Sequence, residues 1–330
     1  MVIGIRADGG KKIGMGHIMR TLVLAKELAG NHDVFYICKV DEPISDKYEG
    51  GIQKVKVNGF EIKLINESRV IDDLKKIQVD LLITDSYDVD EFYFDETKKL
   101  FNKTAYIDDV NLYSYNVDYL INQNINGLDL TYNTNVDTKL ILGPQFIMLR
   151  DEFRNVEKKY IKDKPKDIML TVGGSDEYYV TNQILSYVKS LNYNFHVVVG
   201  PSFNNNNSLK DFENERVRLY YSANMIEIMK NCDVAISACG STLYELAVCG
   251  VPTLGIIVAD NQLGLAKKMA ELELIENVGW FNKLNKSFFV EAFTELCNNI
   301  NKRIDMSEKA ASVIDGQGVR RIVEILTENI

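Results

Sequence analysis

The sequence predicts an α/β protein built from two Rossmann-like domains, each with a mostly parallel sheet. Short apolar runs alternate with amphipathic stretches along almost all of the 330 residues. That alternation is typical of a parallel sheet covered by helices on both faces. The pattern starts again near residue 166, and each half opens with a strand that runs into a glycine-rich loop.

In the first half, we expect the first strand at 2–6 and the first helix from His17 to Gly30. Ile18, Leu22, Ala25 and Ala29 fall on one stripe of that helix. Apolar runs predict further strands, with helices between several of them, at 33–38, 61–65, 79–84, 104–108 and 118–122.

In the second half, a helix is expected at about 177–191, after a strand that ends in a glycine turn. The charged segment near 150–165, which carries Pro165, predicts the boundary between a domain at 1–155 and one at 156–317. No strand follows the last helix, and we expect 318–330 to join the first domain. The strands of this half are expected at 166–172, 195–200, 216–221, 233–237 and 251–257.

Composition and charge exclude several classes of function. The net charge is −9 and the pI is near 5.1, so nucleic acid and anionic membranes would repel the chain. Five cysteines without a C-x-x-C pair, together with only three histidines, argue for reduced thiols and against a metal site. We expect a cytoplasmic protein with no cofactor, no nucleic-acid partner and no membrane partner; its oligomeric state is open, with a monomer favoured.

The first candidate site is the stretch IGMGHIMR at 13–20, between the first expected strand and the first expected helix. It is not a dinucleotide fingerprint, because residue 19 is Met where a third glycine is needed, and it lacks the spacing of a P-loop. Gly14 and Gly16 can let the backbone approach a phosphate at a helix N-terminus. Arg20 lies three residues after His17 and faces the same side.

His17 has two interpretations at this stage. A neutral imidazole at the start of a helix can act as a general base on water. Alternatively, the histidine only caps the helix or packs against its surroundings. The residues alone leave both open.

The second candidate site is SACGSTLYE at 237–245, which follows an expected strand and opens a helix. Small residues allow backbone N–H groups to meet a phosphate, and Glu245 can accept two ribose hydroxyls. The alternative is a plain helix cap with a solvated glutamate. Cys239 is better explained by small-residue packing than as a nucleophile. The candidate phosphate ligands here are Cys239, Gly240, Ser241 and Thr242.

Three further loops follow expected strands, and each is a weak signal alone. The first is the GGSD segment at 173–176, in which Gly173, Gly174 and Ser175 are candidate phosphate ligands. The others are the TDSY segment at 84–87, with Asp85 and Tyr87, and the ADNQ segment at 259–262, with Asn261 and Gln262. In open parallel sheets, ligands bind at the carboxyl ends of the strands, where such loops meet.

The motifs together resemble a known family. I-G-x-G-H-x-x-R, the D-x-Y after the 79–84 strand, Asp108-Asp109, LGPQFIMLRDEF at 142–153, GGSD, SACGSTLYE and DNQ occur in this order. This set is similar to PseG, the UDP-sugar hydrolase family of pseudaminic acid biosynthesis, and to related spore-coat polysaccharide proteins. The first and fourth motifs are the most specific, whereas MurG-type glycosyltransferases share the logic of GGSD and SACGST.

The resemblance implies a GT-B fold, with two domains facing each other across a cleft, UDP on the C-terminal domain and the sugar mainly on the N-terminal one. It implies hydrolysis of UDP-2,4-diacetamido-2,4,6-trideoxy-β-L-altropyranose to UDP and the free sugar, without a metal. The family's catalytic histidine falls on His17, its cleft tyrosine on Tyr87 and its ribose-binding glutamate on Glu245.

Roles for the remaining candidates follow from the proposed reaction. An inverting hydrolase activates water on the face of the sugar opposite the leaving group, and His17 would be that base. We expect Asp8 to orient the imidazole through its other nitrogen. Amides near 240–242 would stabilise the leaving UDP. The candidates for the sugar side are Arg6, Arg20, Asp85, Asn261 and Gln262; the two arginines can alternatively meet the pyrophosphate or hold the loop.

Two other functions remain open. A glycosyltransferase of the same fold would use His17 on an acceptor hydroxyl in place of water, although the acidic balance disfavours a membrane-facing acceptor. A non-catalytic nucleotide-sugar binding module would keep SACGSTLYE but would have no need of G-H-x-x-R.

Overall fold

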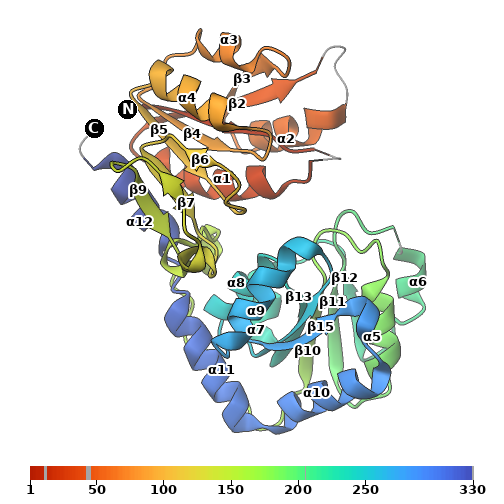
Figure 1. Cartoon of the computed structure of the whole chain (residues 1–330). Coiled ribbons are helices and arrows are strands. Elements are labelled where there is room, and N and C mark those ends of the chain that lie inside the picture. Colours follow the sequence, from red (N-terminus) through yellow and green to blue (C-terminus); the bar gives the residue numbers. More distant parts are fainter. Residues whose placement is uncertain (11–12, 42–45, 205, 329–330) are drawn as a thin grey trace. The chain divides into compact units, whose positions relative to one another are not determined.

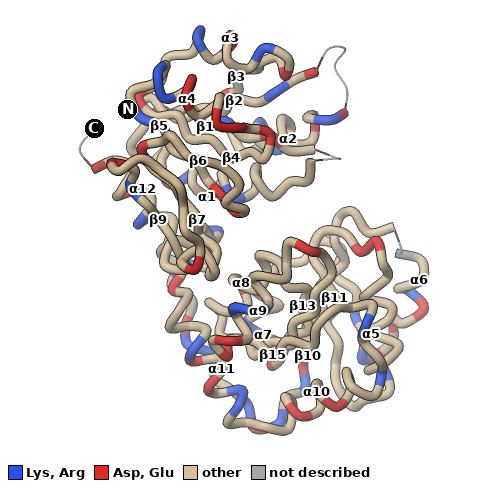
Figure 2. Tube along the Cα trace, in the orientation of Figure 1, with Lys and Arg blue, Asp and Glu red and all other residues tan. Residues whose placement is uncertain are grey.

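The computed structural model describes residues 1–10, 13–41, 46–204 and 206–328 (Figure 1). The chain divides into two compact units, the first made of Met1–Asp151 with Gln317–Ile330 and the second of Glu152–Gly316. Lysine and arginine are interspersed with aspartate and glutamate along both units (Figure 2). Among the described residues, no helix combines the length and the apolar character needed to cross a bilayer.

The first unit is built on a seven-stranded sheet in which every paired neighbour is parallel. The strand order reverses between β1 and β4, and in open parallel sheets ligands bind at the carboxyl ends of the strands at such a point. Across the sheet the strands are β3 (Glu61–Asn66), β2 (Asp33–Val40), β1 (Val2–Ala7), β4 (Leu81–Asp85), β5 (Lys103–Ile107), β7 (Tyr119–Asn122) and β9 (Lys139–Leu142).

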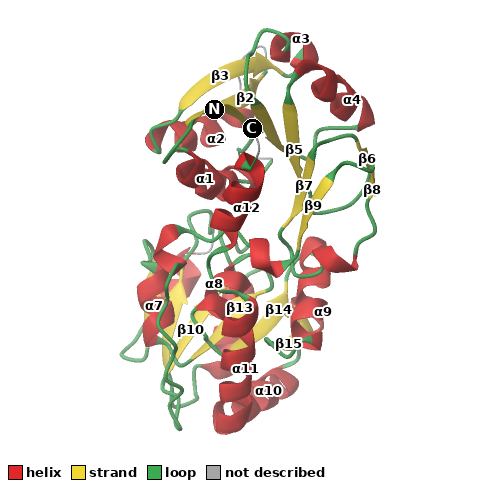
Figure 3. Ribbon diagram, turned by 90° about the vertical axis from the view of Figure 1, so that its left-hand side faces the viewer, coloured by secondary structure: helices red, strands yellow, loops and turns green. Residues whose placement is uncertain are grey.

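Helices cover both faces of this sheet. The helices α1 (Gly16–Leu28), α2 (Asp46–Val57) and α12 (Gly318–Thr327) lie on one face, and α3 (Val70–Leu74) and α4 (Glu91–Leu100) lie on the other (Figure 3). Buried side chains of these helices form the two hydrophobic cores of the unit. The remaining elements are β6 (Ser114–Tyr115) paired with β8 (Asn133–Thr134), and the 3₁₀ turns η1 (Gly127–Asp129) and η2 (Pro144–Phe146).

The second unit repeats the plan with six parallel strands, and its order reverses between β10 and β13. Its strands, in sheet order, are β12 (Val217–Tyr220), β11 (Asn194–Val198), β10 (Asp167–Thr171), β13 (Val234–Ala238), β14 (Thr253–Ile257) and β15 (Glu276–Trp280). Its helices are α5 (Val180–Val188), α6 (Asn206–Lys210), α7 (Met225–Asn231), α8 (Thr242–Val248), α9 (Leu263–Glu271), α10 (Lys286–Asn298) and α11 (Ile300–Val313), and short turns are η3 (Asp151–Phe153), η4 (Asp260–Gln262) and η5 (Phe281–Lys283).

The predicted α/β class with two parallel sheets is confirmed, and every predicted strand has a counterpart within a few residues. Four strands were not predicted: the two-residue strands β6 and β8, and the edge strands β9 and β15. β9 has only four residues, two of them exposed, and β15 contains Gly279 at a φ of +83°, so neither shows a clear apolar run. Ala29 is exposed, because α1 ends at Leu28.

The final helix offers a test of how the chain end supports the first unit. Ile322 on α12 is fully buried in the same core as Ile18 and Leu22 of α1. Ile322→Ala should destabilise the first unit by about 3 kcal/mol, because it leaves a cavity that the packed helices cannot fill. Native-state hydrogen exchange of the β1 and β4 amides would measure this. The exposed neighbour Glu324 is the control, and equal exchange in Ile322→Ala and Glu324→Ala would contradict the assignment.

Candidate functional site

The centre of the candidate site is a contact between His17 and Asp85. β1 and β4 are adjacent and Ala7 is paired with Asp85, so the helix that follows β1 begins beside the end of β4. His17 Nδ1 lies 2.6 Å from Asp85 Oδ1, with 8% and 0% of the two side chains exposed. Because an ionised carboxylate only accepts hydrogen bonds, Nδ1 carries the proton. His17 Nε2 has no hydrogen-bond partner in the described part of the chain.

Arg20 lies one helical turn after His17 and joins two carboxylates. Its Nε and Nη2 donate to the two oxygens of Asp85, each at 2.5 Å, and its Nη1 donates to Asp109 at 2.6 and 2.7 Å. Burial alone would lower the pKa of Arg20, but the two carboxylates hold it well above its usual value. Burial alone would raise the pKa of Asp85, but Arg20 and His17 hold it below its usual value. The group is therefore a buried, ionised network.

Tyr87 and Asn124 complete the network from two further loops. The ring of Tyr87 meets the imidazole of His17 edge to face, with centroids 4.5 Å apart. Its hydroxyl donates to Asp109 Oδ2 at 2.8 Å, and Asn124 Nδ2 donates to Asp109 Oδ1 at 3.0 Å. Tyr87 is still half exposed, so it forms the solvent side of the site beside the buried imidazole.

A second buried carboxylate shapes the turn that carries Asp109. Asp108 accepts hydrogen bonds from the hydroxyls of Tyr115 and Tyr132 and from the backbone N–H groups of residues 110 and 111. Asp109 and Asn124 were not among the predicted site residues. The rule that ligand-facing groups follow parallel strands would have found them, because they follow β5 and β7.

The prediction that Asp8 orients His17 is wrong, because Asp85 holds Nδ1. Asp8 accepts from the backbone N–H of Lys39 at 2.7 Å and pairs with Arg6 at 3.5 Å. The prediction that Arg6 meets the sugar is also wrong, since its guanidinium is fully buried over the ring of Tyr93 on α4. Side chains alternate along a strand, so Arg6 points to the α4 face and away from α1.

Asp85 and Arg20 also differ from their predicted place on the sugar side. Asp85 is fully buried and cannot touch a ligand, because β4 ends beneath α1. Arg20 does not face the sugar side; it holds the local structure, because its donors bind the carboxylate of Asp85 at the end of β4 and that of Asp109 in the turn after β5. Both residues therefore act on the shape and charge of the site.

In the second unit, the loops after β13 and β14 approach each other. The space where Gly240 would carry a Cβ is open, with only the side-chain amide nitrogen of Gln262 at 3.8 Å. Gln262 is held there because its Oε1 accepts from the N–H of Val258 at 3.0 Å. Ser241 is exposed and makes no side-chain cap at the start of α8. Within α8, the N–H groups of Leu243 and Tyr244 already donate to the carbonyls of Gly240 and Ser241, so the backbone N–H groups that can meet an anion are those of residues 240–242.

The loop after β10 contacts the segment that follows β11. Gly173 has a φ of +97°, and the carbonyl of Gly174 accepts from the N–H of Ser202 at 2.9 Å. Asp176 is a structural cap, because it accepts from the N–H groups of residues 180 and 181 at the start of α5. Gly173, Gly174 and the exposed Ser175 stay predictions as phosphate ligands.

Cys239 is confirmed as a packing residue. It is fully buried, and burial raises the pKa of its thiol to about 12. Its sulfur fills the space beside Gly255, where a Cβ would come within 2.9 Å. Only its backbone can face a ligand. Glu245 is partly buried and Asn261 is exposed, and their ligand roles stay predictions. The described residues contain no group of three or more His, Cys, Asp or Glu arranged to hold a metal.

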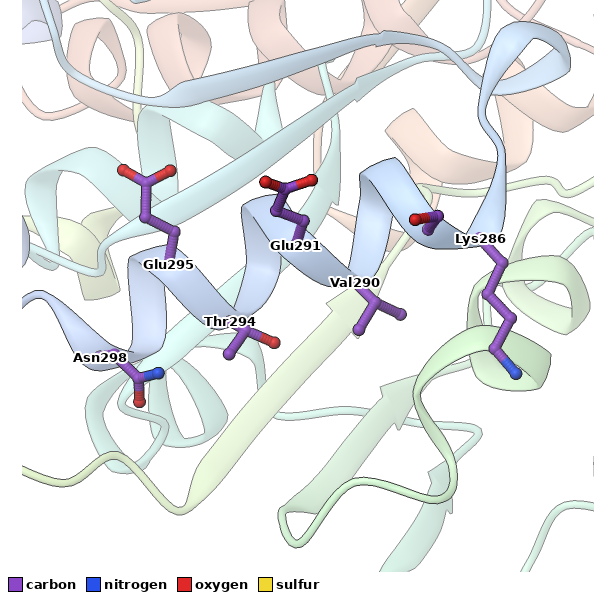
Figure 4. A pocket seen from close by; sticks show the side chains of 7 residues that line it. Lys286, Val290, Glu291, Thr294, Glu295 and Asn298 are labelled. Carbon is purple, nitrogen blue, oxygen red and sulfur yellow. The ribbon is translucent and has the colours of Figure 1, made fainter.

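A shallow, open depression lies along α10 (Figure 4). All of its lining side chains belong to this one helix, and none follows a parallel strand at its carboxyl end. It is therefore the outer surface of a helix, and we assign no chemistry to it. The lining residues are Lys286, Ser287, Val290, Glu291, Thr294, Glu295 and Asn298.

The ionised Asp85 gives a stability prediction with a defined pH range. Asp85→Asn should destabilise the first unit by about 3 kcal/mol at pH 7, because it removes the carboxylate that accepts from three donor atoms of His17 and Arg20. Since the folded pKa of Asp85 is lowered, its contribution is present above pH ~4 and is lost as pH falls through that folded value.

Urea unfolding of both proteins followed by circular dichroism at pH 7, 5 and 3.5 would test this. The difference between them should persist to pH 5 and shrink at pH 3.5. The exposed Asp72, changed to Asn, is the control and should alter stability by less than ~0.5 kcal/mol. A difference that shrinks already between pH 7 and 5 would contradict the assignment.

Comparisons of sequence and fold show which known proteins this chain resembles. Residues 168–322 match the glycosyltransferase family 28 C-terminal domain. An uncharacterised protein of Methanocaldococcus jannaschii is 28% identical over 100% of this chain and 71% of its own length. The spore coat polysaccharide biosynthesis protein SpsG of Bacillus subtilis is 22% identical over 99% of this chain and 98% of its own.

Two further comparisons concern a named hydrolase and a solved structure. The UDP-2,4-diacetamido-2,4,6-trideoxy-β-L-altropyranose hydrolase of Campylobacter jejuni is 26% identical over 83% of this chain and 99% of its own. The crystal structure of Acinetobacter baumannii MurG superposes with a TM-score of 0.72 at 15% identity and covers 99% of both chains. The chain is thus similar in sequence to a PseG-type hydrolase and to SpsG, it shares the two-domain α/β fold of MurG, and its residues 168–322 match the glycosyltransferase family 28 C-terminal domain.

Proposed function

We propose that this protein hydrolyses a UDP-sugar at the anomeric carbon, with His17 as the general base. The observation that carries the proposal is the buried contact between His17 Nδ1 and Asp85, which leaves Nε2 as the proton acceptor. A hydrolase of this class among the homologues supports the reaction type. The other candidate, a structural histidine, would not need a buried carboxylate to fix its tautomer.

The reaction follows from the chemistry of glycosyl transfer. A water molecule loses a proton to Nε2 as its oxygen bonds to the anomeric carbon, while the bond from that carbon to the β-phosphate oxygen breaks and UDP leaves with the electron pair. Asp85 stabilises the imidazolium that forms, as the carboxylate of a catalytic triad does. UDP is a good leaving group once its charge is stabilised, so no strong general acid is required.

The second unit would hold the nucleotide. The uncapped N-terminus of α8 and the open space at Gly240 support a pyrophosphate there, with the amides of 240–242 as donors. Glu245 would accept the ribose hydroxyls. In the first unit, α1 starts after Met15 without a side-chain cap, so Gly14 and Gly16 would also let an anion approach.

The sugar would lie on the first unit beside Tyr87, and Asn261 and Gln262 are the proposed sugar ligands of the second unit. A 2,4-diacetamido-2,4,6-trideoxy-L-altrose-type sugar is our proposed substrate, since one homologue is named for it. The proposed role is in nonulosonate or related surface polysaccharide biosynthesis, and SpsG, named for spore coat polysaccharide biosynthesis, supports that setting.

A glycosyltransferase is the second candidate, because residues 168–322 match a transferase domain. In that case Nε2 would take the proton of an acceptor hydroxyl, and the same His17–Asp85 pair would serve. Turnover would then depend on an added acceptor, whereas a hydrolase needs only water.

The proposed hydrolysis predicts which atom the water attacks. In ¹⁸O-labelled water, the protein should release UDP and a sugar with the label on its C1 hydroxyl. His17→Asn should lower kcat by about 10²- to 10⁴-fold, because the general base is lost, while UDP still binds. Mass spectrometry of the products and calorimetry with UDP would measure both effects.

The matched control is His32→Asn, also in the first unit, which should turn over normally. Label on the phosphate, or normal turnover by His17→Asn, would contradict the mechanism. Release of UDP only when a sugar acceptor is added would favour the transferase.

The proposed nucleotide site predicts how a substitution at Gly240 changes the affinity for UDP. Gly240 has no positive φ, and a methyl group added there would meet no neighbour closer than 3.8 Å, so the fold itself tolerates alanine. If a phosphate approaches this backbone, Gly240→Ala should weaken UDP binding about tenfold or more while leaving unfolding unchanged. Calorimetry with UDP would test this. Gly30→Ala, where a Cβ meets one ordinary contact, is the control; equal UDP affinity in both variants would contradict the site.

A further inference from the structure

Asp85 binds two residues, His17 and Arg20, and the proposed reaction gives no role to Arg20. Its Oδ1 accepts both from His17 Nδ1 at 2.6 Å and from Arg20 Nη2 at 2.5 Å. We propose that Arg20 is a positioning residue that neutralises Asp85, so that His17 stays uncharged and able to accept a proton. This inference rests on the proposed function, since it matters only if His17 is a base.

The geometry ties Arg20 to the same carboxylate from both sides. Arg20 Nε donates to Asp85 Oδ2 while Nη2 donates to Oδ1, which is the bidentate pairing of a guanidinium with a carboxylate. Arg20 Nη2 is also 3.3 Å from His17 Nδ1. Both groups donate, so this short approach is possible because they share one acceptor. A positive charge at that distance opposes a second positive charge on the imidazole.

Counting the charges around the imidazole gives the sign of the effect. The groups that face it are Arg20 from α1, Asp85 from β4, Tyr87 from the next loop and Asp109 from the turn after β5. Burial and Asp109 raise the pKa of Tyr87, so it is neutral. With a neutral imidazole the cluster has one net negative charge. Without Arg20 the cluster would have two net negative charges in a buried place, and these would favour the imidazolium form of His17.

Asp109 keeps Arg20 in this position. It accepts from Nη1 at the far end of the guanidinium, and it is itself held by Tyr87 and Asn124. Arg20 is thus fixed between the carboxylate of Asp85 at the end of β4 and that of Asp109 in the turn after β5, and its side chain is only 15% exposed. A guanidinium used to bind a ligand would keep a free edge, whereas here all three nitrogens contact protein groups.

The test measures the protonation of the His17 ring directly by NMR. The protein has three histidines, so ¹⁵N-labelled rings give few NMR signals, and His17→Asn identifies one of them. In Arg20→Met, the midpoint of His17 ring protonation should move up by about one pH unit, and the acidic limb of the pH profile of kcat/KM should move with it. Arg20→Lys keeps the positive charge, so its midpoint should stay close to that of the wild-type protein.

Two further variants complete the test. Arg20→Gln also removes the charge but keeps an amide that can donate to a carboxylate, so it should raise the midpoint as Arg20→Met does, and the idea stays testable if Arg20→Met fails to fold. Arg320→Met is the matched control, since Arg320 on α12 pairs with Glu27 near the other end of α1. It should leave the His17 midpoint unchanged.

The outcomes separate the two proposals. An unmoved midpoint in folded Arg20→Met overturns the role of Arg20, whatever the activity. An equal shift in Arg320→Met also overturns it, since the effect would then be general. Absence of any UDP-sugar hydrolysis by the wild-type protein overturns the proposed function instead, while the ring titration still reports on Arg20.

Discussion

The buried carboxylate of Asp85 is the interaction on which the candidate site depends. A lone carboxylate with no exposed surface would be costly, so it requires partners that are charged and well aligned. Here the partners are an imidazole and a guanidinium from one turn of α1. Satisfying Asp85 therefore also fixes the tautomer of His17 and the direction of its free nitrogen. The same contact anchors the start of α1 to the end of β4.

The parallel sheets explain why these groups meet at all. In each unit the strand order reverses once, between β1 and β4 in the first and between β10 and β13 in the second. Loops that leave such a point diverge to opposite faces and open a crevice above the strand ends. His17 and Asp85 follow the first reversal, and the glycine loop at 173–174 and the segment 237–245 follow the second. The surrounding hydrophobic cores hold these loops without entering the site.

Much of the site could be predicted, because chemistry-bearing residues follow apolar runs that are recognisable as strands. His17, Tyr87, Gly240 and the packing role of Cys239 are found this way. Closeness in sequence favours Asp8 as the partner of the imidazole, yet Asp85 is 68 residues away and nearer in space. Side-chain alternation decides this, since Arg6 faces α4 while the paired Ala7 and Asp85 face α1.

The sequence by itself determined the α/β class, the order of the strands along the chain and the histidine at the start of the first helix. Periodicity and glycine turns are local properties, so they are readable without a structure. Only the tertiary structure decided that Asp85, Arg20 and Asp109 form one ionised network around that histidine. Strands that are distant in sequence become neighbours in a parallel sheet, and burial then selects which carboxylate stays charged and which donors it must satisfy.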